Sequence, residues 1–304
     1  MTFGKGRLPH LSAFLIVCMI WGLSLVVAYD LLGTGIPPFF LIAVTYGIGA
    51  LTIFSVKAAF VSTPKIGRNE LRYGVLVGIL IFIAFGLQTV GLEYTTPAKS
   101  GLLTVLYVLF VPIIISVMIR KLSVRSILFA AIGFTGVFVM SGAAGGDASV
   151  NIGDIATIVC AIAFAAHFIT LEKCSSSLDP TNFTLIQMIT ATLVAFAISG
   201  MLESGRYDGM DLAGSWAGLA FMGIAVTGLG FFVQTAAQRK IPATTISVMC
   251  CSESVFAMFF SWALGYEMLT LPLLVGAAFV VTSTVLSSIY EKRELIDKKG
   301  VFLR

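Results

Sequence analysis

Glu253 has the clearest potential for chemistry in this sequence. It lies near the middle of a long apolar stretch at 243–265, where an ionised side chain is costly and usually faces a wet cavity or another polar group. A carboxylate there could bind the ammonium group of a solute or carry a proton. It could equally join two helices by a hydrogen bond, which is a common structural role for polar residues in membranes.

Three further polar residues lie within apolar stretches, namely His167, Gln88 and Gln234. His167 could contact a solute or exchange protons near neutral pH, or it could hydrogen-bond a neighbouring helix. Gln88 and Gln234 are expected toward opposite ends of the molecule. They could line the two mouths of one cavity, or they could be ordinary interhelical contacts.

Trp21 and Tyr107 are candidate cavity-lining aromatic residues, and Ser24 and Ser100 are smaller polar candidates on the same two predicted spans. Most aromatic residues in membrane helices nevertheless serve packing or interfacial anchoring. The sequence contains no His-Glu-x-x-His motif and no phosphate-binding loop, so we expect no metal, no cofactor and no direct use of ATP. The five cysteines are expected to be buried as small apolar residues.

The elements that must position these residues are ten stretches of about twenty apolar residues, each long enough to cross a bilayer. The chain of 304 residues is 58% hydrophobic and only 11% charged, with a mean hydropathy of +1.01. A soluble domain carries about 25% charged residues. We therefore expect an all-α polytopic membrane protein with a single membrane domain over 1–304. The predicted spans are 11–29, 39–57, 71–92, 97–119, 125–143, 153–171, 180–202, 215–236, 243–265 and 271–290.

The distribution of basic residues predicts the orientation of these spans. If the N-terminus is cytoplasmic, only Lys99 and Arg206 of the 19 Lys and Arg fall on the outer side. This bias predicts cytoplasmic termini and a multi-pass protein of the cell (inner) membrane. It also accounts for the basic charge without nucleic acid, whose binding would need a basic groove with aromatic residues on a soluble face. A short basic tail at 291–304 is expected to lie on anionic lipid headgroups.

The ten predicted spans divide five and five, so the two halves would enter the membrane in opposite senses. Short matches recur in the same order in both halves, which indicates duplicated domains. They pair Ile16–Cys18 with Ile158–Cys160, Gln88-Thr89 with Gln234-Thr235, and Pro97-Ala98 with Pro242-Ala243. We predict two inverted five-helix repeats at 10–145 and 152–290 around a central cavity, an arrangement typical of secondary transporters.

Three motifs carry a resemblance to a known family: Trp-Gly-Leu-Ser at 21–24, Glu-Ser-Val-Phe-Ala at 253–257 and Gly-Tyr-Glu-Met-Leu-Thr at 265–270. Over roughly residues 10–290 the sequence resembles EamA-type members of the drug/metabolite transporter superfamily. The family usually has proline after the glutamate of the ninth helix, whereas this chain has Ser254. The resemblance therefore does not support a proline kink at that position.

The resemblance implies a ten-helix bundle whose central cavity opens alternately to each side. The first four helices of each half would line this cavity, with the fifth and tenth packed behind them. Family members typically export amino acids, metabolites or drug-like compounds, and some import. We therefore predict a secondary transporter, not an enzyme, that moves a small organic metabolite across the inner or plasma membrane, with export as the expected direction.

Two other classes of function remain as alternatives. Ser24 and His167 are distantly similar to the serine and histidine of rhomboid proteases, but the serine is followed by Leu25 where those enzymes have glycine. A non-transporting membrane protein that binds a partner would need a docking domain or long tail, which the sequence does not indicate. Small-xxx-small patterns at Gly74–Gly78 and Gly214–Gly218 could pack within one chain or form a homodimer face.

Overall fold

The computed structural model describes residues 8–60, 65–94, 100, 103–120, 124–142, 151–175, 178–263, 268, 270–272 and 274–286. Within these ranges the regular structure is helical and contains no strand. The basic tail expected at 291–304, and Lys99 of the orientation argument, lie outside the described residues.

Six helices are long and apolar enough to cross a membrane among the described residues. Five of them correspond to single labelled helices, and the sixth is a continuous helix over Leu212–Gln238. The single helices are α1 (Leu8–Gly33), α2 (Pro38–Phe60), α3 (Arg68–Leu92), α7 (Ile152–Ser175) and α8 (Pro180–Leu202). Proline at the first position of α2 and α8 suits a helix start because its missing N–H has no intrahelical partner there.

The remaining apolar helices are shorter. They are α5 (Tyr107–Ile119), α6 (Val124–Gly142), α11 (Ala243–Cys250), α12 (Ser252–Ala263) and a last helix at Leu274–Leu286. The predicted span 97–119 is not one uninterrupted helix, because Val105 and Leu106 form a turn before α5 begins. The six long helices establish a multi-pass membrane protein, while a complete set of ten spans stays a prediction.

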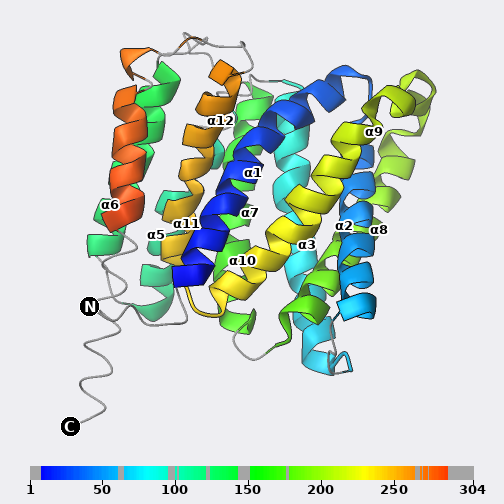
Figure 1. The fold of residues 1–304 in the computed structure, drawn as a ribbon, viewed down its shortest axis with the longest axis horizontal. Coiled ribbons are helices and arrows are strands. Elements are labelled where there is room, and N and C mark those ends of the chain that lie inside the picture. The colour runs from blue at the N-terminus through cyan, green and yellow to red at the C-terminus, as the bar shows by residue number, and fades with distance from the viewer. Residues whose placement is uncertain are drawn as a thin grey trace.

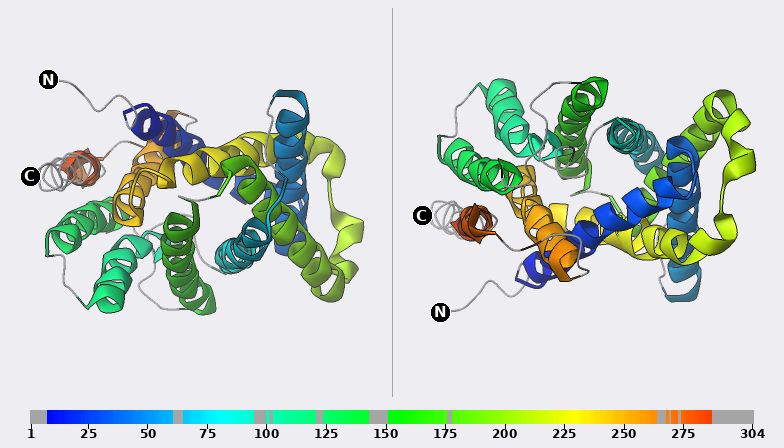
Figure 2. Two further views of the ribbon diagram at one scale, coloured as in Figure 1. Left: turned by 90° about the horizontal axis from the view of Figure 1, so that it is seen from below. Right: turned by 90° about the horizontal axis from the view of Figure 1, so that it is seen from above.

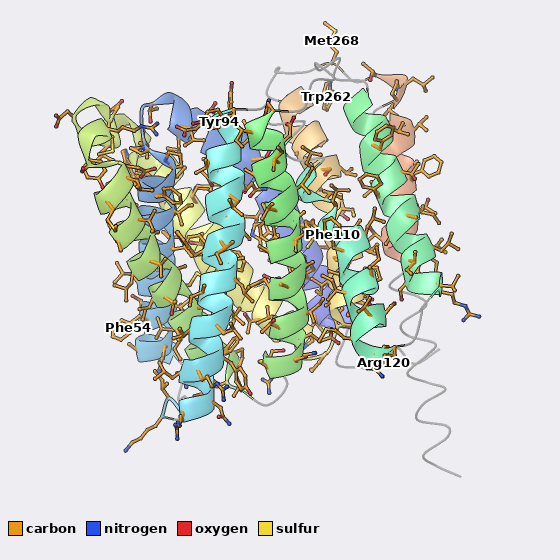
Figure 3. All side chains as sticks on the ribbon, turned by 180° about the vertical axis from the view of Figure 1, so that it is seen from behind. Phe54, Tyr94, Phe110, Arg120, Trp262 and Met268 are labelled. Carbon is orange, nitrogen blue, oxygen red and sulfur yellow. The ribbon has the colours of Figure 1, made fainter. Side chains whose placement is uncertain are left out.

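The helices stand side by side, with their connections at two opposite ends of the bundle (Figure 1). Large apolar side chains cover the flanks of this bundle, and Leu51, Val117 and Leu193 are 66%, 72% and 65% exposed. Figure 3 places Arg120 at one end and Trp262 at the other. An apolar flank between the two ends of a helical bundle is the surface that a bilayer requires.

The helices α2 and α8 form an antiparallel pair that joins the two halves of the chain. At one end, the Glu203 carboxylate after α8 accepts hydrogen bonds from the backbone N–H groups of Phe39 and Phe40 at the start of α2, both at 2.9 Å. At the other end, Lys57 near the end of α2 donates to the Asn182 side chain at the start of α8. Contacts at both ends fix the register of the pair.

The oblique helix that crosses the bundle in Figures 1 and 2 changes its winding along its length. It comprises α9 (Leu212–Phe221), the π-helical segment η2 (Met222–Leu229) and α10 (Gly230–Gln238), and a short 3₁₀ turn, η1 (Ser204–Gly209), precedes it. Within η2, the Val226 carbonyl accepts a hydrogen bond from the Trp21 indole at 3.2 Å. The Thr227 hydroxyl donates to the Thr45 carbonyl of α2 at 2.8 Å. A π-helical segment thus meets both α1 and α2.

The sequence predicts one helix over 243–265, but the structure divides it at Cys251 into α11 and α12. The N–H groups of Cys251 and Ser254 donate to carbonyls three residues earlier, those of Val248 and Cys251, instead of four residues earlier. The interruption therefore occurs without a proline. Its consequence is that Glu253 lies in the first turn of α12.

Candidate functional site

Aromatic side chains from six helices meet in the interior of the bundle. We call them the aromatic cluster: Trp21, Tyr46, Phe85, Tyr107, Phe164, Phe168 and Phe231. The ring centroids of Phe85 and Phe164 are 5.1 Å apart, and those of Trp21 and Phe231 are 5.4 Å apart. Edge-to-face and tilted pairs at such separations are favourable beyond their buried area. The cluster joins residues from the first and second halves of the chain.

Trp21 and Tyr107, two of the sequence-predicted site residues, belong to this cluster and are buried. The ring of Tyr107 contacts Phe168 with a centroid distance of 5.2 Å, nearly edge-on. The ring of Trp21 is held at its N–H by the Val226 carbonyl of η2. Tyr46 brings a buried hydroxyl that has no hydrogen-bond partner among the described residues.

Glu253 lies beside the aromatic cluster and is partly exposed. Its carboxylate has no hydrogen-bond or ion-pair partner within the described part of the chain, yet it is close enough to Tyr107 and Cys160 to interact with them electrostatically. A position in the first turn of α12 favours a negative charge, because the helix dipole is positive at that end. The interruption at Cys251 thus places the Glu253 carboxylate at the N-terminus of α12, where the helix dipole stabilises a negative charge.

Gly22 allows α1 to pack directly against the part of α12 that carries Glu253. A Cβ atom added at Gly22 would lie 2.7 Å from the Phe256 Cβ and 2.8 Å from the Ala257 nitrogen and the Glu253 carbonyl oxygen. Only glycine permits this approach of α1 to the α12 backbone. The two residues at 21–22 therefore have different roles. Trp21 contributes a ring to the aromatic cluster, and Gly22 packs directly against the first turns of α12, where Glu253 lies.

Gln88 belongs to a polar pair next to this region. Its side-chain amide donates to the Thr104 hydroxyl at 3.0 Å, and both side chains are buried. Ser100 is nearly fully buried, and its hydroxyl has no partner among the described residues. Gln88 and Ser100 are therefore interior polar groups on the segments that the sequence analysis expected to line a cavity.

His167 and Gln234 belong to two buried polar pairs on neighbouring helices, His167 with Gln187 and Gln234 with Gln238, which we together call the His167 cluster. The imidazole Nε2 is 3.3 Å from the Gln187 Oε1, and the Gln234 amide donates to the Gln238 Oε1 at 3.1 Å. The structure thus separates the repeat mates Gln88 and Gln234 into two different polar groups. His167 is paired with Gln187 of the neighbouring helix α8. A contact of this kind is one of the two roles considered for His167 from the sequence.

The remaining candidate, Ser24, is buried and donates to the Trp21 carbonyl within its own helix at 2.8 Å. The described contacts of Ser24 and His167 are therefore with other groups and not with each other, so the pair lacks the serine–histidine hydrogen bond of a hydrolase. Within the described residues, no three His, Cys, Asp or Glu side chains are close enough to hold a metal ion.

Sequence reasoning missed Thr104, Gln187 and Gln238, which are buried polar partners of the predicted residues Gln88, His167 and Gln234, respectively. Gln187 carried a usable signal, because it is an amide inside an apolar stretch, as Gln88 is. Gln238 lies two residues past the predicted end of its span, and Thr104 belongs to a type that is common in membrane helices. Their roles follow only from how the helices pack.

The comparisons with known proteins agree with this architecture. The model of the EamA-like transporter family matches residues 9–142 and 151–289, so the chain belongs to that family and is a membrane transporter. An uncharacterized transporter of Archaeoglobus fulgidus is 26% identical over 292 residues, covering 94% of this chain and 88% of the relative. The uncharacterized transporter YvbV of Bacillus subtilis is 28% identical over 313 residues, covering 98% and 96%.

The fold is also similar to that of a protein whose crystal structure is known. The match covers 94% of this chain and 99% of the other chain. Its TM-score is 0.77 and its sequence identity is 17%. At that identity the likeness concerns the fold alone. It agrees with the helical architecture over nearly the whole length of both chains.

Proposed function

We propose that this transporter is a secondary carrier that works by alternating access, with two inverted five-helix halves at 10–145 and 152–290. The antiparallel pair of α2 and α8 supports this arrangement, because corresponding helices of inverted halves must run in opposite directions. The Glu203 carboxylate holds one end of that pair, and Lys57 holds the other. Two halves joined in this way can rock against each other around a central site.

The single observation that carries the proposed site is the Glu253 carboxylate, which has no partner among the described residues and lies beside the aromatic cluster. A carboxylate attracts a cationic group, and aromatic faces attract both cations and apolar surface. The combination fits a small organic solute with a protonated amine and an apolar body. An amino acid, a related metabolite or a drug-like amine meets this description.

The predicted orientation completes the proposal. The basic residues favour cytoplasmic termini in the cell (inner) membrane. The resemblance to EamA-type transporters, which typically export their solutes, makes export the proposed direction. The ion pair of Arg206 with Glu93 joins the two halves at the outer end. The Lys57 contact with Asn182 lies at the inner end. Alternating access requires that contacts at one end open while those at the other end hold.

The proposal is tested by reconstituting the purified protein in liposomes and measuring exchange of a panel of amino acids, nucleosides and cationic dyes. We expect exchange of amine-bearing solutes. Glu253→Gln should lower that exchange about tenfold or more, because a hydrogen bond to a charged group contributes about 1.5–3 kcal/mol and about 1.4 kcal/mol corresponds to a factor of ten. Asp208→Asn is the matched control, since it makes the same chemical change at an exposed position in η1.

Exchange without a pH gradient separates solute binding from proton carriage. If Glu253 only carried protons, Glu253→Gln would retain exchange at equal pH and lose only uptake driven by a proton gradient. Equal exchange rates for wild type and Glu253→Gln under both conditions would contradict any role of Glu253 in the site. A failure of every solute in the panel to move would contradict the proposed solute class.

A further inference from the structure

The His167 cluster combines complete burial with incomplete hydrogen bonding. Its side chains come from α7, α8 and α10, and His167, Gln187 and Gln234 are each 0% exposed. Three of their polar atoms have no partner among the described residues, namely the His167 Nδ1, the Gln187 Nε2 and the Gln234 Oε1. Buried polar groups in folded proteins are nearly always satisfied, so three such atoms in one cluster indicate a hydrogen-bonding ligand.

Several contacts place the residues that carry these atoms at one level of the bundle. The Thr184 hydroxyl of α8 donates to the Thr235 hydroxyl of α10 at 3.1 Å. Gln187 is three residues after Thr184, and Gln234 immediately precedes Thr235. Both amides therefore lie within about one helical turn of the contact between the two threonines.

His167 and its neighbour on α7 reach the same level. The imidazole ring contacts the Phe231 ring of α10 with a centroid distance of 6.1 Å, and Phe231 is three residues before Gln234. The Gln238 amide donates to the Phe168 carbonyl at 2.8 Å. The contacts of α10 with α7 thus lie on both sides of Gln234. Gln234, whose Oε1 has no partner among the described residues, is thereby placed at the level of the α7 turn that carries His167.

The chemistry of the three atoms defines the ligand. The Gln187 Oε1 can only accept a hydrogen bond, so the His167 Nε2 donates to it and a neutral imidazole presents Nδ1 as an acceptor. The Gln187 Nε2 is a donor, and the Gln234 Oε1 is an acceptor. The ligand must therefore both donate and accept. No carboxylate, lysine or arginine belongs to the cluster, and apolar rings of Phe168 and Phe231 contact the imidazole, so a charged ligand would lack compensation.

We propose that the His167 cluster is a second binding site, separate from the Glu253 region, for a small neutral group that donates and accepts hydrogen bonds. Two sources have this chemistry: an internal water molecule, and a hydroxyl or amide of a transported solute. The Phe168 ring lies between the two regions, 5.2 Å from the Tyr107 ring and 5.8 Å from the imidazole. A bound solute would thus be one aromatic ring away from the cluster. The site itself goes beyond the proposed function and does not depend on it.

The sequence offers a direct test because the chain contains only two histidines. In a His10→Asn protein with nitrogen-15-labelled histidine, His167 is the single reporter in an NMR spectrum. We expect a neutral ring whose Nδ1 resonance is shifted upfield from that of a free acceptor nitrogen, as hydrogen bonding to a ligand produces. A resonance at the position of a free acceptor nitrogen, or a ring that is protonated at Nδ1, would overturn the proposal.

A matched pair of variants shows whether the signal comes from the cluster. Gln234→Leu removes the acceptor to which the ligand would donate and leaves Gln187, the partner of the His167 Nε2, in place, so it should move the His167 Nδ1 resonance toward that of a free acceptor. Gln88→Leu removes a buried amide of the other polar group and should leave the resonance unchanged. Equal effects of the two variants, or no effect of Gln234→Leu, would contradict a ligand held by the cluster.

A structure determined at a resolution that shows ordered water separates the two sources. We expect density for a bound group in the cluster. It should lie within hydrogen-bonding distance of the Gln187 Nε2, and also of the Gln234 Oε1 or the His167 Nδ1. If the same density is present with and without a transported solute, the ligand is water. If it is replaced by part of the solute, the cluster is a solute subsite. Direct contacts among the three atoms without intervening density would overturn the site, while solute exchange by the protein would be unaffected.

Discussion

Gly22 is the residue at which two helices approach each other most closely beside Glu253. Alanine at this position would bring its Cβ to 2.8 Å from backbone atoms of α12, so α1 and α12 must move apart. Overpacking of this kind costs about 1–3 kcal/mol. We therefore expect Gly22→Ala to lower the melting temperature in detergent and to reduce solute exchange.

Gly200→Ala is the control for this substitution. Gly200 also lies in a membrane helix, α8, but a Cβ there has no atom within 4 Å. Alanine usually stabilises a helix by about 0.5–1 kcal/mol relative to glycine, so this variant should be as stable as the wild type or more stable. Equal losses of stability in the two variants would show that the approach at Gly22 is not tight.

At the scale of single residues, the sequence predicted which polar groups would lie inside but not their partners. Glu253, His167, Gln88 and Gln234 stood out because apolar surroundings make a polar side chain costly. Their neighbours could not be predicted, because a hydrogen bond such as that of Gln88 with Thr104 depends on how helix axes cross. Whether the eight candidate residues contact a solute stays a prediction.

Glu203 determines how the start of α2 is held, and its effect belongs to the scale of helices. One carboxylate oxygen accepts from Phe39, and the other accepts from Phe40 and from the Ser199 hydroxyl at 2.7 Å. In Glu203→Gln an NH₂ group replaces one of these acceptors and faces a donor. The loss should be about 1–3 kcal/mol, measured as a lower melting temperature.

An exposed carboxylate in the same connection provides the comparison for Glu203. Asp208→Asn changes a residue of η1 on the surface and should leave the melting temperature within experimental error. Because Glu203 neutralises the positive end of a helix that belongs to the other half of the chain, its loss should also loosen the α2–α8 pair. Equal melting temperatures of wild type and Glu203→Gln would refute this capping role.

The helices themselves were largely predictable, because a bilayer demands about twenty apolar residues per crossing. The prediction of 180–202 agrees with α8, and 39–57 lies within α2. The irregular segments were not predictable. The interruption at Cys251 has no proline, and η2 forms where a tryptophan N–H and a threonine hydroxyl join its backbone to α1 and α2. Such backbone shifts depend on contacts far apart in the sequence.

At the scale of the whole molecule, composition predicted a membrane protein and internal matches predicted two halves. The pairing of the halves required the structure, since no local pattern indicates that α2 lies against α8. The order of elements is nonetheless consistent with the proposed duplication. The first turn of α2 and the first turn of α8 each form a hydrogen bond with a side chain from the opposite half of the chain.

The contact between Arg206 and Glu93 makes alternating access testable. The Arg206 Nη2 is 2.6 Å from the Glu93 Oε1, and this hydrogen bond raises the pKa of the guanidinium above its usual value. The two side chains are 50% and 26% exposed, and exposed ion pairs contribute only about 0–1 kcal/mol. The pair can therefore separate at little cost, as the proposed alternating access requires. The five native cysteines are buried, so a water-soluble thiol reagent would react with cysteines introduced at these two positions.

We expect a short thiol crosslinker between Glu93→Cys and Arg206→Cys to stop solute exchange in liposomes, and cleavage of the crosslinker to restore it. Each single-cysteine variant treated with the same reagent is the control and should keep most of its exchange, because modification of one surface residue leaves the halves free to move. Undiminished exchange in the crosslinked double variant would mean that this end of the bundle stays closed during transport. The two halves would then move about some other axis than the one that alternating access between these ends requires.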